Sequence, residues 1–126
     1  MAGSILVVDD DPNMRELLQI HLSNAGYEVS VAEDGVEAGY GLLRQRPDLI
    51  ISDVNMPHLD GFEFVAAIRQ EPQFRNIPVI FLTTAAEAEH RGRDLGAVEY
   101  IGKPVVADKL LTLVAAHVDG GRVPIG

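Results

Sequence analysis

The sequence predicts an α/β protein in which a parallel β-sheet is covered by helices on both faces. Two observations carry this prediction. Five short apolar runs alternate with segments of helical periodicity, and the run at residues 48–52 contains the consecutive apolar residues expected of a strand buried on both faces. Strictly alternating strands and helices build parallel sheets through right-handed crossovers. At 126 residues, the chain has the size of about one domain.

The first predicted strand covers residues 4–8, and a helix follows it. Asp11 is expected to cap this helix, Pro12 suits its first position, and Gly26 ends it. Its expected inward face, read at helical spacing, consists of Met14, Leu17, Leu18, His21, Leu22 and Ala25.

The second strand, predicted for residues 28–32, alternates polar and apolar residues and is therefore expected near a sheet edge. The helix after it is predicted for residues 34–46 and is closed by Pro47. Gly39 and Gly41 each lower its helix propensity by about 1 kcal/mol. We therefore expect a helix that is weak or closely packed.

The second half of the chain repeats the pattern. Asp60 is expected to cap a third helix with Phe62, Val65 and Ile68 facing inward, and a loop follows it. The remaining predicted elements are strands at 78–82 and 99–101, a short charged helix at 87–95, and a last helix at 107–117 with an apolar stripe of Leu110, Leu111, Val114 and Val118. Residues 1–118 are thus expected to form the domain, and residues 119–126, with three glycines and a proline, a flexible tail or the start of a linker.

Composition narrows the class of protein. The net charge of −9 argues against a nucleic-acid surface in this chain. The absence of cysteine excludes disulfides and thiolate metal sites. The amino terminus lacks the charged and apolar regions of a signal peptide, and no apolar stretch approaches the ~20 residues of a membrane span. A soluble, cytoplasmic protein without membrane insertion is expected.

Chemically useful side chains stand where the predicted strands end. Asp9 and Asp10 follow the first strand, Asp53 the third, Thr83 the fourth and Lys103 the fifth. Ligands of open parallel sheets bind outside the carboxyl ends of the strands, so these groups are expected at one rim. Clustered carboxylates repel one another unless a cation offsets their charge. Mg²⁺, which takes one or two carboxylates together with phosphate oxygens, fits this set better than Ca²⁺.

The remaining groups suit phosphoryl chemistry. A lysine presents a cation to phosphoryl oxygens, a threonine hydroxyl donates a hydrogen bond to them, and a carboxylate can itself be the nucleophile. The sequence contains neither a nucleotide-binding glycine loop nor a Gly-x-Ser-x-Gly nucleophile motif. Asp11 is assigned mainly to helix capping.

The chain resembles a response-regulator receiver domain, and around residues 51–57 it is similar to the single-domain chemotaxis regulators. The resemblance spans about Ile5 to Val118. It rests on four motifs, which are Leu6 to Pro12, Asp53 with Met56-Pro57 and Asp60-Gly61, Leu82-Thr83, and Gly96-Ala97 with Tyr100 and Lys103-Pro104. It implies the doubly wound, flavodoxin-like receiver fold with strand order 2-1-3-4-5.

The resemblance also implies a function, which is a phosphorylation switch of two-component signal transduction rather than an enzyme acting on other molecules. Asp53 would accept the phosphoryl group from a sensor histidine kinase or a phosphotransfer protein, and would catalyse only its own phosphorylation and dephosphorylation. Thr83 and Lys103 would hold the phosphoryl oxygens. Tyr100 would turn inward when Thr83 engages the phosphate.

The resemblance implies a Mg²⁺ site as well. Asp10 and Asp53 would bind the ion directly, the main-chain carbonyl of Asn55 would be a third ligand, and Asp9 would act through water. The peptide bond between Lys103 and Pro104 would be cis, an isomer that is cheap only before proline.

The surface through which such domains signal is the part of this chain for which the resemblance to the family implies least. An output partner or a fused effector domain is implied, and a homodimer could form through the fourth helix, fifth strand and fifth helix. Thr84 stands where the family usually has Ala or Gly, and Val105 replaces the usual aromatic residue. Both departures touch that face.

Two other functions remain open from the residues alone. The first strand with Asp9 and Asp11 also resembles the opening of haloacid-dehalogenase-type phosphatases, with Asp9 as nucleophile, Asp11 as general acid, and Thr83 and Lys103 as later motifs. That interpretation lacks the acidic pair expected after the lysine and gives Asp53 no role. The second alternative is an interaction domain of the same fold that is never phosphorylated, against which the full set of site residues argues.

Overall fold

The computed structural model describes residues 3–54, 60–83 and 99–118 of the chain. Within these ranges it contains a parallel five-stranded sheet with the predicted order β2-β1-β3-β4-β5. The strands are β1 (Ser4–Val8), β2 (Glu28–Ala32), β3 (Leu49–Asp53), β4 (Val79–Thr83) and β5 (Glu99–Gly102). The predicted helix at 87–95, Thr84, and the predicted tail at 119–126 lie outside the described residues.

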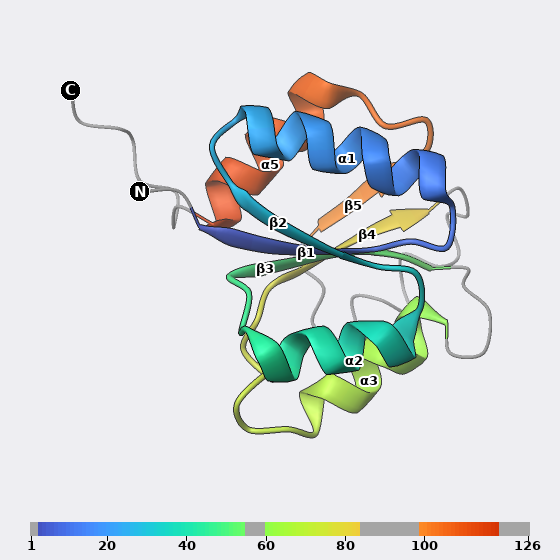
Figure 1. Cartoon of the computed structure of the whole chain (residues 1–126), viewed down its shortest axis with the longest axis vertical. Coiled ribbons are helices and arrows are strands. Elements are labelled where there is room, and N and C mark those ends of the chain that lie inside the picture. Colours follow the sequence, from blue (N-terminus) through green and yellow to red (C-terminus); the bar gives the residue numbers. More distant parts are fainter. Residues whose placement is uncertain (1–2, 55–59, 84–98, 119–126) are drawn as a thin grey trace.

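Helices cover both faces of the sheet, as predicted (Figure 1). On one face lie α1 (Pro12–Asn24) and α5 (Ala107–Val118), and on the other lie α2 (Gly35–Arg44) and α3 (Gly61–Arg69). Alternate residues of the central strands point into two separate apolar cores, one under each helix pair. Ile51 of β3 belongs to the α1/α5 core, and its neighbour Ile50 belongs to the α2/α3 core.

Burial along the strands follows their places in the sheet. All residues of β3 and β4 are buried, whereas β2 alternates between exposed and covered residues at the sheet edge. The parallel register pairs Val8 with Ser52, Asp53 with Leu82, and Thr83 with Gly102. The strands therefore end at one rim, which is where the predicted site residues follow them.

The helix termini carry the expected signals. The Asp11 carboxylate accepts a hydrogen bond from the Asn13 amide at 2.9 Å, and Pro12 occupies the first turn of α1. After α1, Gly26 adopts a φ of 98°, a conformation that residues with a Cβ rarely adopt. Asp60 and Glu63 form a reciprocal capping box at the start of α3.

The inward face of α1 is narrower than predicted. Leu18 and Leu22 are buried, but Leu17 is 41% exposed and Ala25 is also exposed. Leu17 lies about 100° around the helix from Leu18, which turns it away from the sheet. Ala25 is the carboxyl-terminal cap rather than part of the packed helix.

The second helix also differs from its prediction. It runs from Gly35 to Arg44 and not to residue 46, because Gln45 is already extended. Close packing does not explain its two internal glycines, since a Cβ on Gly39 would meet no atom within 4 Å and one on Gly41 would meet Leu6 at an ordinary 3.7 Å. Among the described residues, no helix is long and apolar enough to cross a membrane.

Candidate functional site

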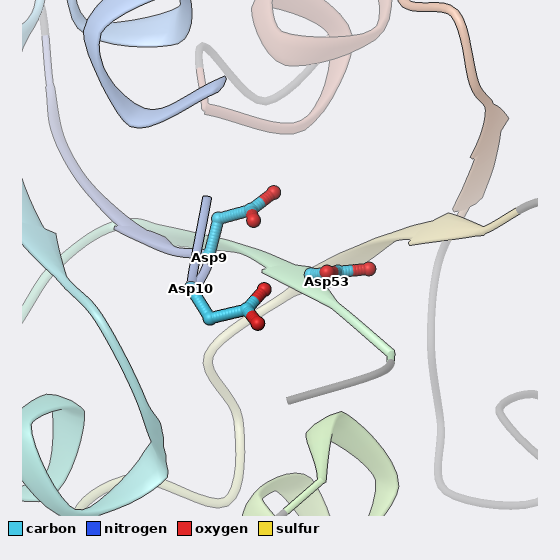
Figure 2. Close-up of side chains that lie close together, drawn as sticks. All are labelled: Asp9, Asp10 and Asp53. Carbon is cyan, nitrogen blue, oxygen red and sulfur yellow. The ribbon is translucent and has the colours of Figure 1, made fainter. Parts of the chain in front are cut away.

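Three carboxylates converge where β1 and β3 end. Oxygen atoms of Asp9, Asp10 and Asp53 all lie within 4.8 Å of one another (Figure 2). Asp9 is fully buried and Asp53 is 5% exposed, whereas Asp10 is open to solvent. The sheet register creates this cluster, because the two acids after β1 and the last residue of β3 belong to neighbouring parallel strands. A compact set of carboxylate oxygens with an open side suits a hard divalent cation.

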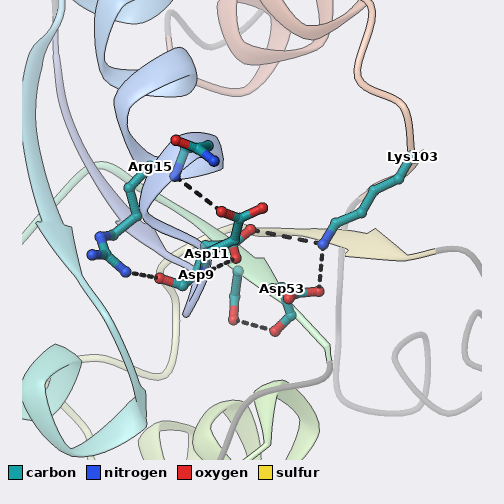
Figure 3. A network of polar contacts seen from close by, with 7 residues as sticks. Asp9, Asp11, Arg15, Asp53 and Lys103 are labelled. Atoms are coloured by element: carbon teal, nitrogen blue, oxygen red, sulfur yellow. Dashed lines mark hydrogen bonds and ion pairs between the residues drawn. The ribbon is translucent and has the colours of Figure 1, made fainter.

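Lys103 brings a positive charge to the same point. Its ammonium nitrogen lies 3.1 Å from Oδ1 of Asp53 and 3.8 Å from Oδ2 of Asp9 (Figure 3). The lysine directly follows β5, and its peptide bond to Pro104 is cis, as predicted. A single ammonium group does not balance three carboxylates, so the site keeps a net negative charge at neutral pH.

Burial and the clustering of these carboxylates raise the pKa of Asp9. Burial raises the pKa of its carboxyl group from 3.8 to about 6, the nearby charges of Asp53 and Asp10 add to the rise, and the Asp11 amide and Lys103 oppose it. Its Oδ2 atom is buried and has no hydrogen-bond partner among the described residues. A buried oxygen without a hydrogen bond, on a carboxylate that belongs to a cluster of three, is an observation that fits a cation or its bound water.

The backbone around Asp9 is held from two sides (Figure 3). The Asp11 amide donates to Oδ1 of Asp9 at 2.9 Å, and the Arg15 guanidinium donates to the main-chain oxygen of Asp9 at 2.7 Å. Arg15 was not among the predicted site residues. Its place in the first turn of α1, six residues after Asp9, is the sequence signal that could have indicated this contact.

Asp53 is positioned by its own loop and by the start of α3. The Ser52 hydroxyl donates to the main-chain oxygen of Asp53 at 2.9 Å, and the Gly61 amide donates to the Val54 oxygen at 2.8 Å. A Cβ on Gly61 would overlap the Asp53 carbonyl oxygen and come within 3.0 Å of Val54 Cα. Only glycine allows this approach, and the sequence motif did not reveal that reason.

Thr83 and Tyr100 lie on the same side of the sheet. Thr83 ends β4 and is almost fully buried, and its main-chain oxygen accepts a hydrogen bond from the Lys103 amide at 3.3 Å. Phe81, two residues before Thr83, lies opposite Tyr100 in the register, with their ring centroids 5.7 Å apart. The Phe81 ring also contacts Phe62 of α3 edge-on at 5.0 Å. An aromatic row thus runs from beside Thr83 to the half-buried ring of Tyr100.

The structure brings together the described residues predicted for the site. Asp9, Asp10, Asp53 and Lys103 form the polar cluster, and Thr83 ends the adjacent strand. Asn55 lies outside the described residues. Asp11, which the phosphatase alternative needs as a general acid, is exposed and caps α1. Val105 is half-buried against the α1/α5 core.

Comparisons with known proteins agree with this geometry. The family model described as "Response regulator receiver domain" matches residues 5–115. The chemotaxis protein CheY4 of Vibrio cholerae is 39% identical, with a TM-score of 0.87 over 93% of this chain and 99% of that one. The receiver domain of the sensor histidine kinase PA1611 from Pseudomonas aeruginosa, solved with a magnesium ion in its active-site cleft, is 30% identical, with a TM-score of 0.85 over 94% and 99% of the two chains.

A longer relative of known family is also similar to this chain. The response regulator MprA of Mycobacterium leprae is 41% identical over 114 residues, which is 89% of this chain and 49% of MprA. This chain therefore spans about half the length of that relative. The family match covers most of the sequence and does not favour the phosphatase alternative. The chain belongs to the response regulator receiver domains of two-component signal transduction.

Proposed function

We propose that Asp53 is the phosphoacceptor of this receiver and takes its phosphoryl group from a sensor histidine kinase or a phosphotransfer protein. The observation that carries the proposal is the ammonium group of Lys103, which lies 3.1 Å from Asp53 Oδ1 inside a cluster of three carboxylates. A cation beside the nucleophile and a net negative cluster of side chains suit the transfer of a phosphoryl group with a bound divalent metal.

The residues present fit Mg²⁺. Asp10 and Asp53 would bind it directly, with the main-chain oxygen of Asn55, and Asp9 would reach it through water. Oδ2 of Asp9 supports this assignment, because it accepts no hydrogen bond among the described residues, lies 3.8 Å from the Lys103 ammonium, and can take a donor such as a metal-bound water. Bound there, Mg²⁺ would offset the carboxylate charge and stabilise the charge on the phosphoryl oxygens.

The transfer itself needs no general base, since Asp53 attacks as an ionised carboxylate. A bond forms between an Asp53 oxygen and phosphorus while the bond between phosphorus and the donor histidine nitrogen breaks. The electron pair of that bond stays on the imidazole. Lys103 and the Thr83 hydroxyl then hold oxygens of the new acyl phosphate. Hydrolysis of the same acyl phosphate by water, at this site, resets the switch.

The conformational change that a partner detects would begin at Thr83. The Thr83 side chain moves toward the phosphate and leaves space beside Phe81, into which the Tyr100 ring turns. The support for this step is the aromatic contact of Phe81 with Tyr100 and their pairing in the register. Phosphorylation shifts the population between the two arrangements only as far as they differ in affinity for the phosphoryl group.

The partners of the switched surface complete the proposal. An output protein or a fused effector domain reads the face that carries β5 and α5, and a homodimer through that face is one form of output. Direct contact with nucleic acid is not expected of this domain, whose chain carries a net charge of −9. A cytoplasmic location remains a prediction.

Titration with Mg²⁺ and beryllofluoride, followed by NMR and calorimetry, tests the proposal. We expect Mg²⁺-dependent binding of one beryllofluoride, with amide shifts around Asp53, Thr83 and Tyr100. Asp53→Asn should abolish it, and Asp108→Asn, a matched change at an exposed carboxylate on α5, should leave it intact. Absence of heat and of shifts with the wild-type chain would favour the interaction domain that is never phosphorylated.

A further inference from the structure

The outer surface of α2 carries an apolar stripe that the phosphorylation site does not use. Val36, Tyr40 and Leu43 are 55%, 64% and 71% exposed. They are spaced by four and three residues, so they lie along one side of the helix. Isolated exposed apolar residues are ordinary, but three large ones in a row on one side of a helix form an apolar patch of the kind found at interaction surfaces.

A hollow lies beside this stripe, between α2 and α3. Its volume is about 470 Å³, its lining includes Gly39, Ala67 and Phe64, and Glu71 is the only charged residue among the described residues that line it. A Cβ added to Gly39 would meet nothing within 4 Å. The glycine thus leaves an open hole next to the protruding Tyr40 ring.

We propose that this surface, the α2 face, pairs with the α2 face of a second copy of the chain, with the two helices antiparallel. A two-fold interface must be self-complementary, and one helix here supplies both a projecting ring and a hole for it. An antiparallel pair centred between Gly39 and Tyr40 places the Tyr40 ring of each copy over Gly39 of the other. The same register places Val36 opposite Leu43 of the second copy.

The charged residues of α2 also favour the antiparallel arrangement of the two helices. Glu37 and Arg44 lie near opposite ends of α2 and only about 20° apart around the helix axis. In the antiparallel pair, Glu37 of each copy therefore lies on the same side as Arg44 of the other copy. The antiparallel helix dipoles add to this attraction. A parallel pair would instead bring like charges together. Because the stripe is short and each chain carries a charge of −9, the dimer is expected to be weak and reversible.

This inference does not depend on the proposed phosphorylation, and it concerns a different surface from the β5/α5 face. Sedimentation of the unphosphorylated chain at physiological ionic strength should show concentration-dependent dimers. Tyr40→Glu should weaken dimerisation at least about tenfold. Ile20→Glu, at a residue of α1 that is 49% exposed, is the matched control and should change it little.

Cross-linking tests the register, which is possible because the natural chain has no cysteine. A mixture of Val36→Cys and Leu43→Cys proteins should form mixed disulfides about tenfold faster than Ile20→Cys forms disulfides with itself, and faster than either α2 variant alone. A chain that stays monomeric up to about 1 mM would overturn the pairing and leave the hollow to another protein. Mixed disulfides no faster than the Ile20→Cys control would overturn it equally.

Discussion

Replacing Asp9 with asparagine should stabilise the metal-free protein at neutral pH while weakening its metal site. The carboxyl group is fully buried, and its pKa is raised to about 6, first by burial and then by the charges of Asp53 and Asp10. A rise from 3.8 to about 6 corresponds to about 3 kcal/mol of penalty on the charged form. Asn keeps the acceptor for the Asp11 amide and removes the charge. A gain of up to about 3 kcal/mol is therefore expected.

The pH dependence follows from the direction of the shift. Because the folded-state pKa lies above the unfolded one, the charged Asp9 destabilises the fold fully above about pH 6, and the penalty fades as the pH falls toward 3.8. Below that value the carboxyl group is protonated in both states. The stability difference between Asp9→Asn and the wild type should be small near pH 3.8, grow between pH 4 and 6, and level off above.

Urea unfolding with a chelator, compared across this pH range, measures the effect. Saturating Mg²⁺ should reduce the difference, because losing a water-mediated ligand typically lowers metal affinity by about 10–100-fold. Asp10→Asn, at an exposed carboxylate of the same cluster, is the control and should raise metal-free stability much less. An Asp9→Asn protein that is no more stable than the wild type at pH 7, with an unchanged m-value, would show that the buried charge of Asp9 does not destabilise the fold.

Two further substitutions test the frame of the site. Gly61→Ala should cost about 1–3 kcal/mol in urea unfolding and weaken Mg²⁺ binding, because its methyl group overlaps the Asp53 carbonyl oxygen. A neutral effect would mean that the loop can move away freely. Asp60→Ala should cost about 1 kcal/mol by removing the acceptor for the Glu63 amide, and Asp60→Asn should keep most of that stability. Equal losses in both variants would contradict the capping role.

Much of the fold was predictable because the spacing of apolar residues in this sequence follows which faces of the strands and helices are buried. The consecutive apolar residues of β3 and the alternation in β2 correctly separated a central strand from an edge strand. The rule that parallel strands end at one rim then placed Asp9, Asp53 and Lys103 together without any contact information.

The features that the sequence could not predict depend on how particular atoms of different segments approach one another in the folded chain. Leu17 looks like a core residue by spacing, but its exposure is decided by how α1 is rotated against the sheet. Arg15 reaches the Asp9 carbonyl through a long side chain that no periodicity marks. The need for Gly61 arises from a backbone carbonyl contributed by another segment. Each depends on tertiary packing rather than on local pattern.

The most direct test of the central claim is to locate the acyl phosphate. The chain would be incubated with acetyl phosphate and Mg²⁺, and the modified residue would be mapped by peptide mass spectrometry. We expect one phosphoryl group on Asp53, none in the Asp53→Asn protein, and little modification without Mg²⁺. Stoichiometric modification of Asp9 would contradict the assignment of Asp53 as phosphoacceptor and favour the phosphatase interpretation. Modification that persists at another residue after Asp53→Asn would contradict the assignment as well.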